Sequence, residues 1–232
     1  MALTERHVAR VTRDVPFTGY NPAFTYCSDD DYEAIVRGLI DSCPTPDDLW
    51  LFASGSLIWK PETDYLESRI GRIGGYHRSF CMRIIQYRAT PDEPGLMMAL
   101  DRGGQCKGVV FRLNPEAMED QLHKLARREM RTLPSNNTPK WVTAETDRGP
   151  VRALAFVMNR EGPSYVGRQP LDQTVRMLAR ACGHVGSCAE YLYNTVAHLE
   201  ELGIHDRHLW MLQERVAAQI AEDCGMAADG AR

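Results

Sequence analysis

The chain has 232 residues, of which 44% are hydrophobic, 25% charged and 8% aromatic, which is typical of a globular protein with enough apolar material for a core. A net charge of −4 argues against a general nucleic-acid-binding protein, which would carry an excess of basic residues. No window approaches the about 18 consecutive apolar residues of a membrane span, and the charged N-terminus lacks the apolar core of a secretory signal. We therefore expect a cytoplasmic protein with no nucleic-acid or membrane partner.

The first 28 residues contain Pro16, Gly19 and Pro22 and show no sustained periodicity, which predicts an arm laid over the domain. A short helix is predicted next, because Ser28 can cap its first turn and Asp29, Asp30 and Asp31 suit the positive end of a helix dipole. Pro44 ends this helix. Residues 1–48 are thus predicted to be an arm followed by a short helix.

From Leu49 to about Val157 the pattern changes to short β-rich segments separated by Gly and Pro. The predicted strands cover residues 49–53, 79–86, 96–100, 106–113, 141–145 and 151–158. The sequences "GGYHR", "TPDEPG" and "DRGGQ" are predicted to separate them. One helix interrupts the strands at about 115–131, since Asn114 can cap it and Pro115 suits its first turn.

The rest of the chain has helical patterns over residues 171–182, 188–202 and 206–222. Ser187, with Glu190 three residues later, predicts a capping box for the second of these helices. Strands followed by helices indicate an α+β fold, with a compact mixed sheet or barrel and helices outside it. We expect residues 49–222 to form a single domain and residues 223–232 to form a disordered tail.

The seven cysteines are scattered, which predicts free thiols in a reducing compartment. One segment, "CGHVGSC", places Cys182, His184 and Cys188 close enough in sequence to consider a metal. Their spacing fits no standard zinc pattern. Small buried thiols are therefore favoured, and no metal site is predicted.

The predicted helix at 115–131 carries an informative carboxylate. Its apolar stripe consists of Met118, Leu122 and Leu125, and the next position on that stripe is Glu129. A carboxylate that faces the interior must form a pair, become neutral, or face a cavity that holds a substrate. From the residues alone, an ion pair between Glu129 and Arg127 or Arg128 near a fraying helix end is favoured over a functional role.

The sequence "ASGSL" places three small residues between two apolar stretches. Such residues expose successive backbone N–H groups, which can bind a carboxylate or a developing oxyanion. A simple turn requires the same residues and is the more common explanation for them. No GxSxG motif is present, so the sequence does not support a nucleophilic serine.

Five arginines lie between residues 69 and 88 of this acidic chain: Arg69, Arg72, Arg78, Arg83 and Arg88. They predict either a positive patch for a small anion or a solvated strand face with surface ion pairs. The sequence does not distinguish these two interpretations.

In order along the chain, the blocks "LWLFASGSLIWKP", "GYHRSFCMRIIQYRATPDEPGLMMALDRGGQCKGVVFRL", "ARREM", "PKWV" and "YLYNTVAHLEELGIHDRHLW" together resemble the ChaC-type γ-glutamylcyclotransferases, in particular their bacterial branch. The resemblance spans about residues 49–216. It implies the cyclotransferase-like fold, a small mixed β-barrel with flanking helices and a helical C-terminal part. It also implies cleavage of the small molecule glutathione to 5-oxoproline and cysteinylglycine, with no metal or organic cofactor.

The resemblance also implies which residues form the site. The family's "FGYGSL" loop, which would bind the γ-glutamyl group, falls on Phe52, Ala53, Ser54, Gly55, Ser56 and Leu57. The family's catalytic glutamate falls on Glu129, as general base and then general acid. Ser54 stands where the family has Tyr, which removes a phenol that could contact the substrate. The "GGY" that follows the glutamate in animal members is also absent, whereas "REM" with a downstream "WV" resembles the bacterial form.

Two other functions remain open at this point. The chain could be a non-catalytic protein that binds γ-glutamyl groups and regulates a cation transporter, which the substitution of Tyr by Ser54 favours. It could also be a cyclotransferase that acts on other γ-glutamyl amines.

Overall fold

A computed structural model describes residues 1–226 of the chain, so most of the tail predicted from residue 223 onward lies outside the described residues. The chain divides into two compact units. The first, here called the barrel unit, comprises Asn21–Ser79 and Met98–Tyr165. The second, here called the helical unit, comprises Met1–Tyr20, Phe80–Met97 and, of the described residues, 166–226.

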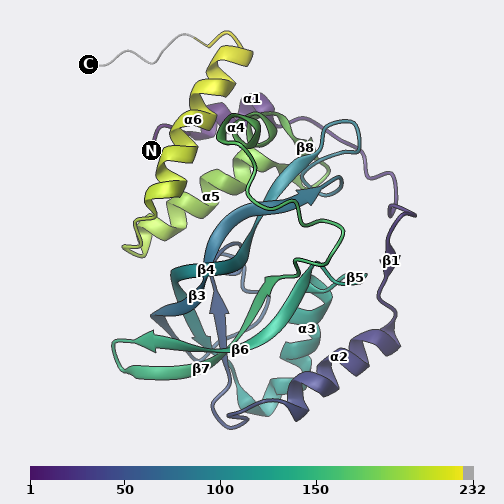
Figure 1. Ribbon diagram of the computed structural model, residues 1–232, viewed down its shortest axis with the longest axis vertical. Helices are drawn as coiled ribbons and strands as arrows, with labels where there is room; N and C mark the ends of the chain where they lie inside the picture. The colour runs from purple at the N-terminus through teal and green to yellow at the C-terminus, as the bar shows by residue number, and fades with distance from the viewer. Residues whose placement is uncertain (227–232) are drawn as a thin grey trace. The chain divides into compact units, whose positions relative to one another are not determined.

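The barrel unit is built on a closed barrel with the strand order β2-β4-β3-β6-β7 (Figure 1). These strands are β2 (Trp50–Ala53), β3 (Glu67–Ile84), β4 (Gly95–Arg112), β6 (Asn137–Thr146) and β7 (Gly149–Met158). β6 and β7 form an antiparallel hairpin from the Asn137–Met158 pair to the Thr146–Gly149 pair. The parallel pairing of β2 with β7 closes the barrel, and the α+β barrel predicted from the sequence is thereby confirmed.

Two predicted breaks in the strands are wrong. The "GGYHR" sequence lies inside β3, and "DRGGQ" lies inside β4, which joins the two strands predicted at 96–100 and 106–113. Gly75, Gly103 and Gly104 have positive φ angles of 81°, 108° and 68°. Glycine tolerates this conformation, so a strand can bend or bulge at these positions without ending. Both long strands consequently continue from one unit into the other.

Two helices accompany the barrel, α2 (Asp29–Asp41) and α3 (Met118–Glu129), and they lie side by side (Figure 1). The predicted cap of α2 is confirmed, because Ser28 and Asp31 form a capping box. Asn114 caps a 3-10 turn, η1 (Pro115–Ala117), that precedes α3. The core between the helices and the barrel contains Val36, Leu39, Leu49, Leu51, Leu122, Leu125 and Leu154.

A short strand pair joins the N-terminal segment to the residues after α3. β1 (Thr25–Tyr26) pairs antiparallel with β5 (Thr132–Leu133). The N–H of Cys27 extends this contact by donating to the carbonyl of Arg131 at 3.0 Å. Residues 25–27, at the end of the segment predicted as an arm, are therefore paired with the residues just beyond the C-terminal end of α3.

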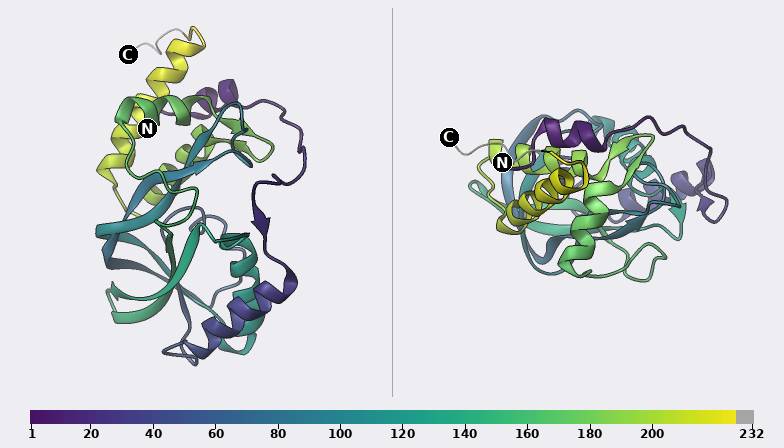
Figure 2. Two further views of the ribbon diagram at one scale, coloured as in Figure 1. Left: turned by 45° about the vertical axis from the view of Figure 1, so that its right-hand side comes forward. Right: turned by 90° about the horizontal axis from the view of Figure 1, so that it is seen from above.

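The helical unit contains α1 (Glu5–Val11), α4 (Leu171–Arg180), α5 (Cys188–Glu201), α6 (Arg207–Asp223) and the two-residue strands β8 (Cys182–Gly183) and β9 (Gly186–Ser187). α4, α5 and α6 pack against one another, in green to yellow in Figure 2. The segment predicted as an arm contains a helix that the sequence did not indicate, α1, which buries His7 and Val11 one turn apart. Two positions are too few to produce a periodic signal.

The predicted capping box of α5 is half confirmed. The N–H of Glu190 donates to the Ser187 hydroxyl at 3.0 Å, but the Glu190 carboxylate pairs with Arg88 at 2.5 Å. Among the described residues, no helix has the length and apolar character needed to cross a membrane.

A close approach between β2 and β4 determines where the segment after β2 begins. Gly108 of β4 lies so near Ala53 that a Cβ atom at position 108 would stand 2.3 Å from the Ala53 carbonyl oxygen. Such a contact forces the backbone to move. Glycine at position 108 therefore allows β2 to stay paired with β4 as far as Ala53, its last residue.

We expect Gly108→Ala to lower the free energy of unfolding by about 1–3 kcal/mol, because the added methyl group overpacks the β2–β4 contact. The matched control is Gly74→Ala in β3, where a Cβ atom would meet no heavy atom within 4 Å. Urea denaturation of both variants measures the difference. Equal stability of the two variants would contradict this account of the contact.

Candidate functional site

Residues 54–60 leave the barrel at the end of β2 and form a short helical turn. The N–H of Ile58 donates to the carbonyl of Gly55 at 2.8 Å, and the N–H of Lys60 donates to that of Ser56 at 2.9 Å. Within the described part of the chain, the N–H groups of Gly55, Ser56 and Leu57 donate to no backbone carbonyl. They resemble the free donors of a helix N-terminus. The small residues of "ASGSL" therefore form a turn that presents three successive donors.

The other residues of the predicted loop are inside the protein. Phe52 and Ala53 are the last residues of β2, with exposed fractions of 1% and 0%, and the Leu57 side chain is also buried. Ser54, Gly55 and Ser56 are only half-buried. Of the six predicted loop residues, these three are the most accessible to a ligand, while the others hold the turn in the core.

Arg78 of β3 fixes the start of this turn. Its guanidinium is buried and donates from Nε to the Ser54 carbonyl at 2.6 Å and from Nη2 to the Lys107 carbonyl at 2.5 Å. A charged donor in this position makes strong, short hydrogen bonds. Arg78 thus ties the first residue of the turn to β4.

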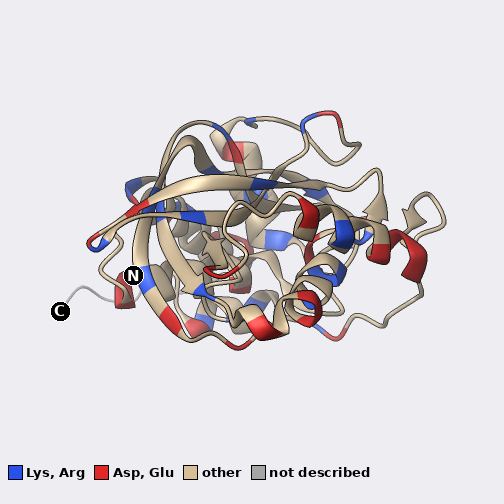
Figure 3. Ribbon diagram, turned by 90° about the horizontal axis from the view of Figure 1, so that it is seen from below, with Lys and Arg blue, Asp and Glu red and all other residues tan. Residues whose placement is uncertain are grey.

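The five arginines at 69–88 do not act as one surface. Arg78 is buried, Arg69 pairs with Glu67 at 2.7 Å, and Arg88 pairs with Glu190. Figure 3 shows basic and acidic residues interspersed along the strands of the chain. These three of the five arginines therefore have partners within the protein.

A separate open hollow of about 510 Å³ lies along β3 and the hairpin turn between β6 and β7. Its lining consists of Ser68, Arg69, Ile70, Gly71, Arg72, Lys107, Glu145, Thr146, Asp147 and Arg148. Neither Glu129 nor residues 54–57 belong to it. The residues that the sequence predicts for chemistry therefore lie outside this hollow.

Glu129 is the last residue of α3. Leu122 and Leu125, which precede it on the same stripe, are fully buried. The Glu129 side chain follows them inward and is only 17% exposed. The inward direction predicted from helical spacing is confirmed.

Both oxygens of the Glu129 carboxylate accept hydrogen bonds. Oε1 accepts from Arg128 Nε at 3.1 Å, and Oε2 accepts from Asn137 Nδ2 at 3.2 Å. The same Asn137 nitrogen lies 3.1 Å from the Glu129 main-chain carbonyl, to which it also donates. The ion pair with Arg128 that the sequence suggested is therefore present, but it does not move the carboxylate to the surface.

Arg128 connects this carboxylate to the turn after β2. Its side chain is 15% exposed and donates from Nη2 to the Ser56 hydroxyl at 2.9 Å. Nη1 contacts the Lys60 carbonyl and lies 3.1 Å from Glu62 Oε1. One guanidinium thus contacts Ser56, Lys60, Glu62 and Glu129. The structure brings the predicted glutamate and the predicted loop together in one place.

Two residues of this arrangement were not identified from the sequence. Asn137 lies in "SNNTPK", which has no pattern beyond that of a polar connection. Arg78 is one of five arginines that lie close together in sequence, and nothing in the sequence separates it from the other four. No local signal marks the partners of either side chain.

Burial raises the pKa of the Glu129 carboxyl above its ordinary range, although the positive charges of Arg128 and Arg131 act in the opposite direction. A carboxyl with a higher pKa in the folded chain binds its proton more tightly there than in the unfolded chain. Its ionised form therefore reduces stability at every pH above the folded pKa. The loss shrinks as the pH falls through that pKa toward the unfolded value of about 4.3.

We expect Glu129→Gln to raise the unfolding temperature at about pH 7, because glutamine keeps the shape and removes the buried charge. The difference from the unchanged protein should shrink as the pH falls toward about 4.3. Circular dichroism melting curves across this pH range measure it. A lower unfolding temperature for the variant at neutral pH would mean that the ion pair with Arg128 outweighs desolvation.

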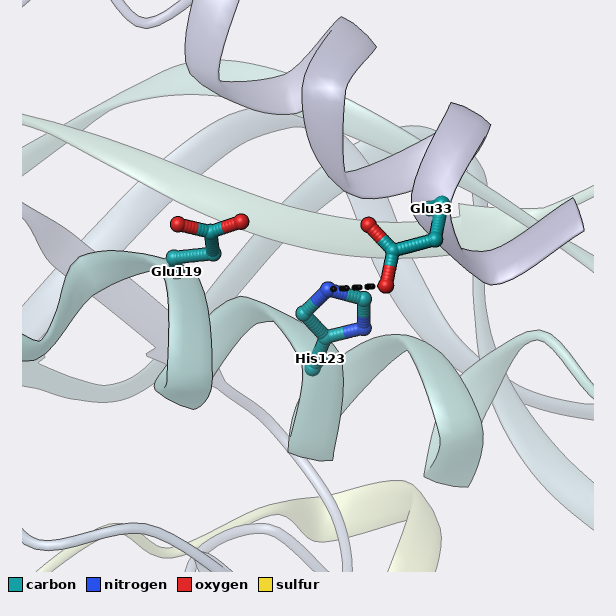
Figure 4. Close-up of side chains that lie close together, drawn as sticks. All are labelled: Glu33, Glu119 and His123. Carbon is teal, nitrogen blue, oxygen red and sulfur yellow. Dashed lines mark ion pairs between the residues drawn. The ribbon is translucent and has the colours of Figure 1, made fainter. Parts of the chain in front are cut away.

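A group of metal-ligand type lies between α2 and α3. Glu33 on α2 faces Glu119 and His123 on α3, which are one turn apart (Figure 4). One ligand atom from each lies within 4.8 Å of the others, and His123 Nε2 is 3.5 Å from Glu33 Oε1. Glu33 and Glu119 are exposed, so an ion pair between neighbouring helices accounts for the contact.

The sequence-level metal candidate does not form such a group. Within the described residues, Cys182, His184 and Cys188 are not brought together as a set of three ligands. Cys182 and Cys188 are buried free thiols, as the sequence predicted. Desolvation raises the pKa of Cys188 to about 12, which keeps it protonated.

Residues 49–219 match the family model described as "ChaC-like protein". The chain is 35% identical over 181 residues to the glutathione-specific gamma-glutamylcyclotransferase of Escherichia coli (strain K12), covering 78% of each protein. It is 30% identical over 181 residues to glutathione-specific gamma-glutamylcyclotransferase 1 of Mus musculus, covering 75% of this chain and 81% of the mouse protein.

The fold is also similar to that of a solved structure. A gamma-glutamyl cyclotransferase specific to glutathione, from yeast, superposes with a TM-score of 0.67 at 22% identity. The superposition covers 74% of this chain and 96% of the yeast chain. At 22% identity this similarity is evidence about the fold alone. The shared fold agrees with the barrel predicted from the sequence.

Proposed function

Because the chain belongs to the ChaC-like family, we propose that it is a glutathione-specific γ-glutamylcyclotransferase, which cleaves glutathione to 5-oxoproline and cysteinylglycine. The observation that carries the proposal is the enclosed Glu129 carboxylate, linked through Arg128 to the turn at Ser56. Residues 49–222 would form the catalytic domain. Glutathione is the small-molecule partner.

The reaction is an intramolecular acyl transfer. The α-amino nitrogen of the γ-glutamyl group attacks the γ-carbonyl carbon of the same group, and a five-membered lactam closes. The bond from the γ-carbon to the cysteine nitrogen then breaks and releases cysteinylglycine. Well-oriented intramolecular reactions reach effective molarities of about 10⁵–10⁸ M, so holding the substrate in a folded conformation supplies much of the rate.

Two proton transfers remain for the protein to perform. An α-amino group has a pKa near 8, so at neutral pH it is mostly protonated and cannot attack. The departing cysteine nitrogen, in turn, must gain a proton. The ammonium first loses one proton to water. As the free amine attacks, the Glu129 carboxylate takes a second proton from the same nitrogen, and the resulting acid returns that proton to the leaving nitrogen. Its raised pKa brings the carboxyl nearer the working pH, which suits both roles.

The turn after β2 supplies the second part of the site. The N–H groups of Gly55, Ser56 and Leu57 hold either the α-carboxylate of the substrate or the oxyanion that forms at the γ-carbon. Arg78 keeps the turn in place through the Ser54 carbonyl. Phe52, Ala53 and Leu57 seat it in the core.

This scheme needs neither a metal nor an organic cofactor. The substrate supplies the nucleophile and the electrophile, and Glu129 supplies the base and the acid.

Two other functions are tested by the choice of substrate. Ser54 in place of the family's Tyr favours a protein that binds γ-glutamyl groups without catalysis and regulates a cation transporter. The other alternative is a cyclotransferase for other γ-glutamyl amines. Purified protein is incubated with glutathione and, separately, with γ-glutamyl dipeptides, and 5-oxoproline is measured by mass spectrometry. We expect 5-oxoproline from glutathione. 5-Oxoproline from the dipeptides alone would support a cyclotransferase for other γ-glutamyl amines, and no 5-oxoproline from either substrate would support the non-catalytic binding protein.

We expect Glu129→Gln to lower turnover of glutathione by at least about 10²-fold, because glutamine cannot accept or return the proton. The matched control is Glu119→Gln on the exposed face of the same helix, which should keep normal activity. Steady-state kinetics of 5-oxoproline release compares them. Near-normal turnover in the Glu129 variant would exclude this residue as the base.

A further inference from the structure

The Glu129 side chain stands at a helix end, where few neighbours on its own helix can restrain it. α3 ends at Glu129, and Met130 has non-helical angles of φ −130° and ψ 62°. The last carbonyls of a helix have no partner within the helix. A carboxylate at this position therefore needs support from another element to keep one direction.

Asn137 provides that support from the barrel. Its Nδ2 lies 3.1 Å from the Glu129 main-chain carbonyl and 3.2 Å from Oε2 of the carboxylate. An amide nitrogen carries two hydrogens, so it can donate to both acceptors at once. The two bonds restrain the backbone and the side chain of Glu129 together.

Asn137 is itself held on a regular element. It is the first residue of β6 and pairs with Met158 of β7 at the end of a continuous antiparallel hairpin. Its N–H donates to the Ser135 hydroxyl at 3.2 Å. Side chains on paired strands hold a site more precisely than side chains on loops.

We propose that Asn137 is a positioning residue that fixes the direction of the Glu129 carboxylate and stabilises its ionised form. The proposal rests on the function assigned to Glu129 above. With Oε2 held by Asn137 and Oε1 by Arg128, the carboxylate is restrained in rotation and can present its remaining lone pairs to the substrate amine.

Several charged groups act on the same carboxylate. Arg128 pairs with it directly, Arg131 contributes its positive charge, and Glu62 lies on the other side of the Arg128 guanidinium. Arg128 also contacts Ser56, so its removal would disturb the turn after β2. Asn137 is neutral, and both of its side-chain bonds described here go to Glu129. Its replacement therefore removes two bonds to Glu129 and leaves the contact between Arg128 and Ser56 in place.

The sign of the effect on proton binding follows from the hydrogen bond. A donor to a carboxylate favours the ionised form, so its loss moves the pKa of Glu129 upward. The base is then protonated over a wider pH range. The acidic limb of the pH profile of kcat/KM should move to higher pH, which a purely structural defect would not produce.

The variant is Asn137→Leu, which keeps the size of the side chain and removes both donors. The matched control is Asn136→Leu at the neighbouring position, where the Oδ1 atom is buried without a hydrogen-bond partner. The first measurement is the titration of the Glu129 carboxyl carbon by NMR in protein labelled with ¹³C-glutamate, in the absence of substrate. Its signal is identified by its loss in Glu129→Gln.

We expect the titration midpoint to move to higher pH in Asn137→Leu and to stay in place in Asn136→Leu. We also expect kcat for glutathione to fall about 10- to 100-fold in the first variant, with a smaller change in KM. Asn137→Asp is the second variant if leucine prevents folding; its added negative charge should move the midpoint upward as well.

An unchanged midpoint in the folded Asn137 variant would overturn the proposal. Failure of the proposed function is distinguishable, because the unchanged protein would then release no 5-oxoproline from glutathione. The NMR titration needs no turnover, so it tests the contact between Asn137 and Glu129 in either case.

Discussion

The arrangement depends on a carboxylate kept away from water. Glu129 is only 17% exposed, and a charge in that position is costly unless it is paired and hydrogen-bonded. Arg128 and Asn137 meet this requirement from two different elements. Desolvation of the carboxylate still outweighs the effect of the neighbouring positive charges, so the pKa of Glu129 stays above its ordinary range. The same imbalance reduces stability at neutral pH and makes the carboxyl hold a proton more tightly than an exposed glutamate does.

The closed barrel is what makes this pairing geometrically possible. β2 delivers the turn that carries Ser56, and β6 delivers Asn137. Both strands pair with β7, so the position of one determines that of the other through a continuous ladder of hydrogen bonds. α3 packs onto this barrel through Leu122 and Leu125. The end of the helix is therefore directed to the place where the two strands present their polar groups.

Arginine is used here for its geometry as much as for its charge. A planar guanidinium with five donors can bind several acceptors at fixed angles. Arg128 contacts two carboxylates, a hydroxyl and a carbonyl, and Arg78 holds two carbonyls in the interior. Lysine, with its single compact charge, could not replace either without leaving acceptors unsatisfied.

Local patterns predicted much of what the structure contains. The period of α3 determined that Glu129 faces inward, because a helix repeats every 3.6 residues whatever surrounds it. Ser28 as a cap and the turn at Ser54 followed in the same way from the preferences of single residues. The strands at "GGYHR" and "DRGGQ" could not be predicted, since glycine permits both a break and a bend and only neighbouring strands decide between them.

What the sequence by itself determined is therefore the helices from α2 onward and the inward direction of one carboxylate, because these depend on residues within a turn or two of each other. The tertiary structure alone decided that Asn137 donates to Glu129 and that Arg78 holds Ser54. Those contacts join separate elements, and they exist only once the register of the barrel brings the elements within hydrogen-bond distance.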